Sequence, residues 1–181
     1  IKLKKILFLL PTYNESKNIE RLYFLLKKVN LKLSYLFIDH GSIDGTLTII
    51  KSIKKKFPKN VFLITKKIRE GIGKAHKDGL KWSYKKNYDL VITMDTDLAH
   101  HPKYIKNLIF KSKNFDLVVG SRYLKKKSMT NWSWFRILLS NSAHFMSFIL
   151  FNVTHDTTNS FRCYNLKKIN KNFISLCKSN S

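Results

Sequence analysis

The sequence LVITMDTDLAHHP occupies residues 90–102, and the rest of the chain is best interpreted outward from it. Its first five residues form a short apolar run, the pattern of a buried strand. The run ends at Asp95 and Asp97, and because residues i and i+2 of an extended chain point the same way, their carboxylates can converge on one ligand. Two close carboxylates repel each other unless a cation lies between them, and their oxygens suit Mg²⁺ or Mn²⁺. Taken alone, the spacing favours a simpler alternative, an acidic turn exposed to solvent.

The segments around this stretch alternate between strand and helix patterns. Strands are expected at residues 4–10, 35–39, 60–64, 90–94 and 116–120, with a short one near residue 164. Helices are expected between them, at residues 17–29, 46–57, 75–86 and 102–111. This alternation predicts an α/β layer built on a mostly parallel sheet. The chain contains no evident linker or internal repeat, so residues 1–181 are expected to form a single domain.

Polar loops follow the strands at one predicted edge of this sheet, where open parallel sheets bind ligands. The first loop carries Tyr13, whose ring could stack on a base, and Glu15, whose carboxylate could accept from a base or a ribose. Asp39 ends the second strand. The segment REGIGK, residues 69–74, lacks the spacing of known phosphate-binding loops but could bring Arg69 or Lys74 near a pyrophosphate. Capping and packing are the alternative roles for these polar residues.

Composition restricts the partners of the chain without naming one. Lysine and arginine number 35 against 11 aspartate and glutamate residues, a formal net charge of +24. This charge implies an anionic partner (nucleic acid, an anionic membrane surface or a phosphate-bearing substrate), unless the lysines only form solvated helix faces. Cys163 and Cys177 have no metal-binding spacing, and a disulfide is not expected. The chain contains no run of about 20 apolar residues that would predict a transmembrane span.

Residues 132–153 have the pattern of an amphipathic helix. Apolar residues cover much of one side, and the polar residues on the other side are Arg136, Ser140, His144 and Ser147. Tryptophans and lysines accompany the segment, which is typical of a helix lying in a membrane interface. An ordinary helix packed on the sheet fits the same pattern.

Five short motifs occur in order along the chain. They are PTYNE at residues 11–15, DHGSIDGT at 39–46, MDTDLAHHP at 94–102, GSRY at 120–123 and DTTNSFR at 156–162. Together they resemble the motifs of the family-2 glycosyltransferases, and within that family those of the dolichol-phosphate mannosyltransferases and their polyprenol-phosphate relatives. The resemblance spans residues 4–164, nearly the whole chain. It implies a GT-A-like, Rossmann-like three-layer sandwich that binds a nucleotide sugar on a mixed sheet.

The resemblance also implies roles for individual residues. The residues implied to bind the nucleotide-sugar donor are Pro11, Tyr13, Glu15, Asp39, His40, Asp95, Thr96 and Asp97. Asp95 and Asp97 would handle the donor diphosphate through a divalent metal, Mg²⁺ or Mn²⁺. The residues implied to receive the phosphate of a lipid acceptor are Arg122, Arg136, Ser140 and Arg162. The expected catalytic residues are Asp97, Arg122 and Arg136. The two arginines suit this role because a guanidinium can hold phosphate with two hydrogen bonds.

Three departures from the family pattern qualify these expectations. Relatives usually carry a second aspartate where this chain has His40, a position that reads the base in some of them, so the donor nucleotide stays open. Ala99 stands where relatives often have a polar residue that can assist the metal. The chain also stops soon after the last motif, whereas relatives usually continue, and a truncated carboxyl end is expected.

The expected function is a metal-assisted, inverting transfer of mannose from GDP-mannose to a polyprenyl (dolichyl) phosphate at the cytoplasmic face of a membrane. The nearest alternative is a family-2 enzyme that uses UDP-glucose or a related donor, with a lipid phosphate or a polysaccharide as acceptor. A basic nucleic-acid-binding module is a third interpretation, which the acidic motifs oppose because carboxylates repel phosphate when no metal intervenes. The expected partners are therefore a nucleotide sugar, a lipid phosphate and a membrane surface, and not nucleic acid.

Overall fold

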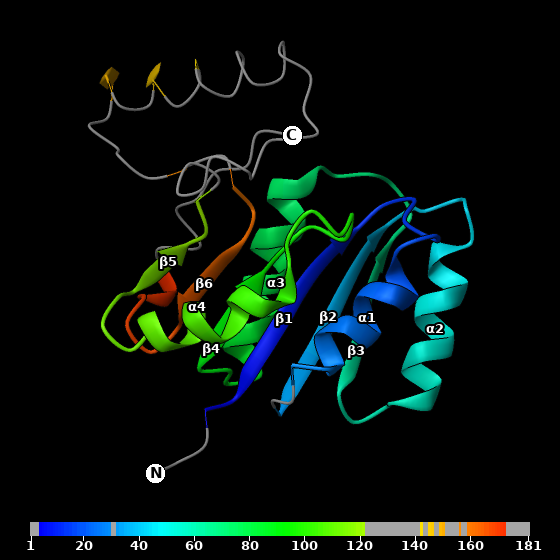
Figure 1. Cartoon of the computed structure of the whole chain (residues 1–181). Helices are drawn as coiled ribbons and strands as arrows, with labels where there is room; N and C mark the ends of the chain where they lie inside the picture. The colour runs from blue at the N-terminus through cyan, green and yellow to red at the C-terminus, as the bar shows by residue number, and fades with distance from the viewer. Residues whose placement is uncertain are drawn as a thin grey trace.

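The computed structural model describes residues 4–29, 32–121 and 159–172, together with positions 142, 145, 146, 149, 150 and 156. These residues are built around a six-stranded sheet in the order β3-β2-β1-β4-β6-β5 (Figure 1). Its strands are β1 (Ile6–Thr12), β2 (Leu33–His40), β3 (Val61–Lys66), β4 (Leu90–Thr93), β5 (Leu117–Val119) and β6 (Arg162–Asn165). Strands β3, β2, β1 and β4 are parallel, and β6 runs antiparallel between β4 and β5. The prediction of a mixed, mostly parallel sheet is confirmed.

Helices cover both faces of this sheet. They are α1 (Ile19–Lys27), α2 (Thr46–Lys56), α3 (Ile72–Lys85) and α4 (Ile105–Lys111), the last preceded by the 3₁₀-helix η1 (Pro102–Tyr104). Buried side chains of α1, α2 and α4 pack in one cluster on one face, and those of α3 pack in a second cluster on the other (Figure 1). The three-layer α/β sandwich expected from the sequence is confirmed.

The two clusters follow from the alternation of side chains along the central strand. Phe8 and Leu10 of β1 belong to the cluster formed with α1, α2 and α4, whereas Leu7 and Leu9 belong to the cluster formed with α3. All four side chains are 0% exposed. A central parallel strand covered on both faces must be apolar throughout, which is why this part of the sequence shows a continuous apolar run.

Strands β1 and β2 extend further than the sequence pattern predicted. The ladder between β1 and β4 stops at Leu9, so the missing N–H of Pro11 costs no bond on that side and β1 continues to Thr12. β2 continues to His40, which lies in register with Lys66 of β3. His40 is therefore a strand residue at the carboxyl edge of the sheet, where the sequence pattern had placed a loop.

Two helices also begin at other residues than expected. α1 begins at Ile19 and not at residue 17 as expected, with Asn18 in the N-cap position, and the N–H groups of Asn18 and Ile19 donate to the Glu15 carbonyl. α3 begins at Ile72, ahead of the expected Ala75, because Gly71 with a φ of 81° turns the chain directly into the helix.

The helix expected at residues 132–153 lies mostly outside the described residues, and so do Arg122, Arg136 and Ser140. Within that segment, positions 145, 146, 149 and 150 are helical, and their apolar side chains are 52% to 61% exposed. In the described part of the chain, every helix is too short or too polar to cross a membrane.

Candidate active site at the carboxyl edge of the sheet

Hydrogen bonds join the loops that follow β1 and β2. The N–H of Asn14 donates to Ser42 Oγ (3.0 Å), and the N–H of Ile43 donates to Asn14 Oδ1 (3.0 Å). Asp39 holds Ser42 in turn, because its Oδ1 accepts from Ser42 Oγ (2.5 Å) and its Oδ2 accepts from the Ser42 N–H (3.2 Å). Asp39 is only 1% exposed, so this buried carboxylate stabilises the conformation of the two joined loops through Ser42.

A second set of hydrogen bonds ties the first loop to the start of α2. The N–H of Glu15 donates to Thr46 Oγ1 (2.8 Å), and the N–H of Ser16 donates to Asp44 Oδ2 (3.0 Å). The Thr46 hydroxyl donates to Asp44, and this bond, with further backbone bonds from Ser16 and Thr46, lowers the pKa of Asp44 against the opposing effect of burial. The ionised Asp44 thus helps to hold Tyr13 and Glu15 at the edge of the sheet.

A cavity of about 230 Å³ opens at the carboxyl ends of β1, β2 and β4. The loops after these strands and the start of α3 form its walls. The lining residues are Pro11, Thr12, Tyr13, Glu15, Ile38, His40, Arg69, Gly71, Ile72, Ala75, Asp95, Thr96 and Asp97. Every residue implied to bind the donor lines this cavity except Asp39, which is occupied with Ser42 beside it.

One wall of the cavity is aromatic and cationic. The Arg69 guanidinium lies over the Tyr13 ring, 4.5 Å from its centroid, and the Tyr13 side chain is 38% exposed. Lys74, the other basic residue that the sequence placed near a pyrophosphate, instead pairs with Asp78 (3.4 Å) and does not line the cavity. A flat ring and a guanidinium together can bind a planar base or a phosphate.

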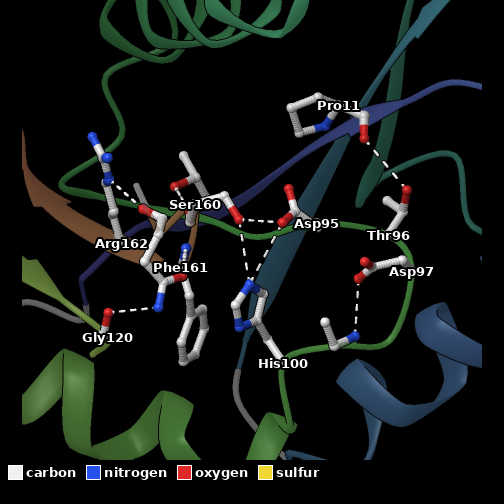
Figure 2. A network of polar contacts seen from close by, with 12 residues as sticks. Pro11, Asp95, Thr96, Asp97, His100, Gly120, Ser160, Phe161 and Arg162 are labelled. Atoms are coloured by element: carbon white, nitrogen blue, oxygen red, sulfur yellow. Dashed lines mark hydrogen bonds and ion pairs between the residues drawn. The ribbon is translucent and has the colours of Figure 1, made fainter. Parts of the chain in front are cut away.

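Asp95, which also lines the cavity, lies in a polar network with Ser160 and His100 (Figure 2). Ser160 Oγ donates to Asp95 Oδ2 (2.5 Å), and His100 Nε2 lies 3.6 Å from the same oxygen. The His100 ring stacks on Phe161, with ring centroids 5.1 Å apart. Burial acts to raise the pKa of Asp95, but the hydrogen bonds from His100 and Ser160 outweigh it and keep the pKa below its ordinary value. The carboxylate is therefore ionised at neutral pH.

Asp97 lies on the same loop and is exposed. Its Oδ1 accepts from the N–H of Ala99 (2.9 Å), and between the two carboxylates Thr96 Oγ1 donates to the Pro11 carbonyl (3.4 Å; Figure 2). The described residues include no group of three His, Cys, Asp or Glu side chains arranged around a metal position. Two carboxylates on one cavity do fit a hard divalent cation that takes its other ligands from phosphate and water.

The segment after residue 158 carries Ser160 to the network. Asn159 Nδ2 donates to the Gly120 carbonyl (2.7 Å), Arg162 Nε donates to the Asn159 carbonyl (2.7 Å), and Thr93 Oγ1 donates to the Ser160 carbonyl (2.6 Å). Figure 2 shows Arg162 beyond Ser160, on the far side from Asp95. Arg162 does not line the cavity, so the structure does not bring this implied acceptor residue to the donor side of the site.

Sequence reasoning did not single out three histidine and serine side chains near the site: His76, His100 and Ser160. Ser160 and His100 do lie inside quoted motifs, so a signal for both was present. His76 of α3 has none, because a helical pattern does not reveal which polar residue turns toward a ligand. Burial and, to a smaller extent, the charge of Arg162 lower the pKa of His76 to about 4 against the opposing charge of Asp95, so this imidazole is neutral and close to both groups.

Known proteins resemble this chain in sequence. A family model described as "Glycosyl transferase family 2" matches residues 8–173. The chain is 29% identical over 178 residues to "Polyprenol monophosphomannose synthase" of Mycolicibacterium smegmatis, a match that covers 97% of this chain and 67% of the relative. It is 34% identical over 142 residues to "Dolichol-phosphate mannosyltransferase" of Pyrococcus furiosus, which covers 77% of this chain and 39% of that protein. The chain thus spans about two thirds of one relative and about two fifths of the other.

Solved structures share the fold. A mannosyltransferase from Pyrobaculum calidifontis in complex with GDP-Man and Mn²⁺ superposes with a TM-score of 0.52 at 22% identity, covering 59% of this chain and 32% of that one. Glucosyl-3-phosphoglycerate synthase from Mycobacterium tuberculosis, in complex with Mn²⁺, UDP and glucosyl-3-phosphoglycerate, superposes with a TM-score of 0.58 at 18% identity, covering 91% and 57%. At these identities the likeness concerns the arrangement of the sheet and helices.

Proposed function

This chain belongs to glycosyl transferase family 2, and from that membership we propose that it moves mannose from GDP-mannose to a polyprenyl phosphate such as dolichyl phosphate. The observation that carries the proposal is that Tyr13, Asp95 and Asp97 line the same cavity. It offers an aromatic ring for a base and two carboxylates for a metal-bound diphosphate. The names of both curated relatives support mannose as the sugar and a polyprenol or dolichol phosphate as the acceptor.

On the donor side, the proposal assigns the nucleoside to the end of the cavity near Tyr13 and Glu15, and the diphosphate to the end near Asp95 and Asp97. A divalent cation, Mg²⁺ or Mn²⁺, held by these two aspartates would neutralise the charge that develops on the departing nucleoside diphosphate. Ser160 orients Asp95 through its 2.5 Å hydrogen bond. Arg69, whose guanidinium lies over Tyr13, is in place to contact either the base or a phosphate.

On the acceptor side, the nucleophile is a phosphate monoester that already carries negative charge at neutral pH. It needs positioning and charge neutralisation more than a general base, and arginine supplies both. We assign this role to Arg122 and Arg136, with Ser140 and Arg162 as further contacts. Direct attack at the anomeric carbon forms the phosphate–sugar bond, releases the nucleoside diphosphate and inverts the configuration.

The acceptor lipid sets the place of the reaction, and we propose that the chain works at the cytoplasmic face of a membrane. Its net charge of +24 favours an anionic surface. The exposed apolar positions Phe145, Met146, Ile149 and Leu150 are helical and fit contact with lipid.

Transfer of labelled sugar tests the proposal. The full chain is mixed with Mn²⁺ and vesicles that contain a polyprenyl phosphate, and receives either GDP-[¹⁴C]mannose or UDP-[¹⁴C]glucose. We expect label in the lipid fraction with GDP-mannose only, and loss of that label on adding EDTA. If label reached the lipid only from UDP-glucose, GDP-mannose would be rejected as the donor and UDP-glucose would take its place. Transfer to a soluble sugar with none to the lipid would reject the acceptor.

A pair of aspartate variants locates the activity. Asp97→Ala removes one carboxylate from the cavity wall and should lower kcat/KM by about 100-fold or more, because a contact to the transition-state charge is lost. Asp116→Ala removes an exposed carboxylate that directly precedes β5 and does not line the cavity, so it should leave kcat/KM unchanged. If the two variants had equal kcat/KM, Asp97 would have no role in the reaction and would only be part of an acidic turn exposed to solvent.

A further inference from the structure

Three isoleucines are exposed on the loops around the donor cavity. Ile43, in the loop between β2 and α2, is 87% exposed, and Ile68, in the loop between β3 and α3, is 76% exposed. Ile72, which begins α3 and lines the cavity, is 59% exposed. Figure 1 shows both loops at the end of the sheet toward which β1 and β2 point. We call these three side chains the isoleucine rim.

The two loops that carry the rim pack against each other. A Cβ on Gly41 would lie 2.8 Å from the Lys67 carbonyl oxygen, so the two loops are in direct backbone contact. The N–H of Ile43 also donates to Asn14 Oδ1 (3.0 Å), which ties the same surface to the loop after β1. The rim is therefore presented by loops that are fixed relative to one another.

Basic side chains accompany the isoleucine rim. Lys67 and Arg69 are exposed on either side of Ile68. The loops at the opposite edge of the sheet, which lead into β3 and β4, are polar, and their exposed residues include Lys59, Asn60, Lys86 and Asn87. Single exposed apolar side chains are common on proteins, so the position of the rim carries the argument and not its size. Aliphatic side chains beside lysine and arginine are typical of a surface that contacts anionic lipid.

The proposed reaction requires the carboxyl edge of the sheet to face a bilayer. The phosphate of a polyprenyl phosphate stays at the membrane surface because its chain is buried in lipid, and it must reach the sugar beside Asp95 and Asp97. The cavity opens at the carboxyl ends of β1, β2 and β4, so the loops that project from this edge approach the same membrane surface. The isoleucine rim lies on two of these loops.

We propose that the isoleucine rim enters the interface of the bilayer that holds the acceptor, with Lys67 beside anionic headgroups, and so turns the mouth of the donor cavity toward the lipid phosphate. The inference rests on the proposed lipid acceptor and deepens it by naming the surface that meets the membrane. Ile43 and Ile68 do not line the cavity, so their role is distinct from binding the donor. The net charge and residues 145–150 retain the chain on the membrane, and the rim sets its orientation.

A fluorescent label tests the contact directly. Ile68→Cys is labelled with NBD in the full chain carrying Cys177→Ser, and Cys163 is protected by burial. Vesicles containing phosphatidylglycerol should raise the NBD emission and shift it to shorter wavelengths, and spin-labelled lipid should quench it. The control is Phe115→Cys, at a 59% exposed side chain just before β5 on the opposite edge, and it should show neither change.

Two results with the label would overturn the proposal. One is an emission at residue 68 that vesicles leave unchanged. The other is an emission that rises with protein concentration when no vesicles are present, because a second copy of the chain would then cover the rim.

Transfer kinetics test the orientation. Ile43→Ser with Ile68→Ser should raise the KM for polyprenyl phosphate in vesicles by about tenfold or more, because less apolar area enters the interface. The KM for water-soluble geranyl phosphate and the Kd for GDP should stay native, since neither depends on a bilayer. An unchanged KM in vesicles would overturn the proposal, and so would an equal rise in all three constants, which would show a damaged cavity.

A matched pair of charge reversals separates position from net charge. Lys67→Glu and Lys59→Glu each lower the net charge by the same amount, but Lys59 lies just before β3 at the opposite edge. Lys67→Glu should raise the KM in anionic vesicles by about fivefold or more, because its charge lies within the range of the surface potential. Lys59→Glu should change it by less than about twofold, because screening removes the effect of a distant charge. Equal effects of the two variants would mean that the rim does not face the membrane.

The same experiments distinguish the rim from the proposed reaction. If the chain transfers mannose to neither acceptor while the label at residue 68 enters the lipid, the reaction fails and the membrane contact stands. If the chain transfers mannose to polyprenyl phosphate while the label stays in water, the reaction stands and the role of the rim fails.

Discussion

At the residue scale, the orientation of Asp95 depends on one hydroxyl. Ser160 Oγ donates to Asp95 Oδ2 at 2.5 Å, and hydrogen bonds to charged groups contribute about 1.5–3 kcal/mol. Ser160→Ala should therefore raise the Mn²⁺ concentration needed for half-maximal transfer by about tenfold, because the carboxylate is no longer held toward the cavity. Activity measured across a Mn²⁺ series gives this value directly.

The control for this prediction is Ser83→Ala in α3. Ser83 is also buried, and its Oγ donates to the Gly79 carbonyl at 2.6 Å, but it makes no contact with the cavity. The control should lose some stability while its Mn²⁺ dependence stays native. The same Mn²⁺ shift in both variants would show that lost stability, and not the orientation of Asp95, is the cause.

His76 should make the fold sensitive to acid. Its folded-state pKa is about 4, lowered by burial and by Arg162 against Asp95, whereas an unfolded histidine titrates near pH 6.5. Between these values the unfolded chain binds more protons than the folded chain, so the free energy of unfolding falls as the pH falls from 6.5 to 4, by about 3 kcal/mol in total.

Urea denaturation in EDTA at pH 7, 6, 5 and 4.5 measures this dependence. His76→Gln cannot take up the proton, so its free energy of unfolding should fall less steeply between pH 6.5 and 4 than that of the native chain. Parallel curves for the two proteins would show that His76 does not stay neutral in the fold.

At the element scale, the packing of α3 on the sheet depends on Gly79. A Cβ at this position would lie 2.2 Å from Leu9 Cδ1 and 3.0 Å from Ile38 Cδ1, and both side chains are fully buried, so they would have to shift within the packed core. Gly79→Ala should therefore destabilise the fold by about 1–3 kcal/mol despite the higher helix propensity of alanine. Lys81→Ala, on the exposed side of α3, should cost less than about 0.5 kcal/mol. Urea midpoints of the two variants decide between crowding against β1 and a general effect of alanine in α3.

Sequence patterns identified the elements well because their causes are local. The apolar run that ends at Asp95 predicted β4, and the strand–helix alternation predicted the three layers. The antiparallel position of β6 between β4 and β5 could not be derived, because strand order depends on contacts between residues far apart in the chain.

The candidate site, like the fold, could be predicted where local patterns determine it and not where it depends on contacts between distant residues. Residues on loops after parallel strands, such as Tyr13 and Asp97, could be placed at one edge from topology alone. The inward role of Asp39 could not, since it depends on Ser42 folding back onto its carboxylate. His76 was also beyond prediction, because the side of α3 that faces Arg162 is set by helix packing.

At the scale of the whole molecule, a net charge of +24 on 181 residues should make the chain bind preferentially to anionic membrane surfaces. Attraction to anionic lipid amounts to about 1 kcal/mol for each lysine or arginine near the surface, and is screened within a Debye length of about 8 Å at physiological salt. In a vesicle flotation assay, we expect the chain to bind vesicles that contain phosphatidylglycerol and not vesicles of phosphatidylcholine alone. Adding 0.5 M NaCl should release most of the bound chain.

The salt-resistant part of this binding tests for insertion of apolar side chains. Burial of apolar area is insensitive to screening, so vesicles should retain a fraction of the chain at 0.5 M NaCl if Phe145 and Leu150 enter the lipid. Phe145→Ser with Leu150→Ser should abolish that fraction while binding at low salt persists. Phe110→Ser, which removes a 64% exposed ring from α4, serves as the matched control and should leave it unchanged. Equal loss in both variants, or complete release of the native chain by salt, would mean that the chain is held by its charge alone and that residues 145–150 do not enter the membrane.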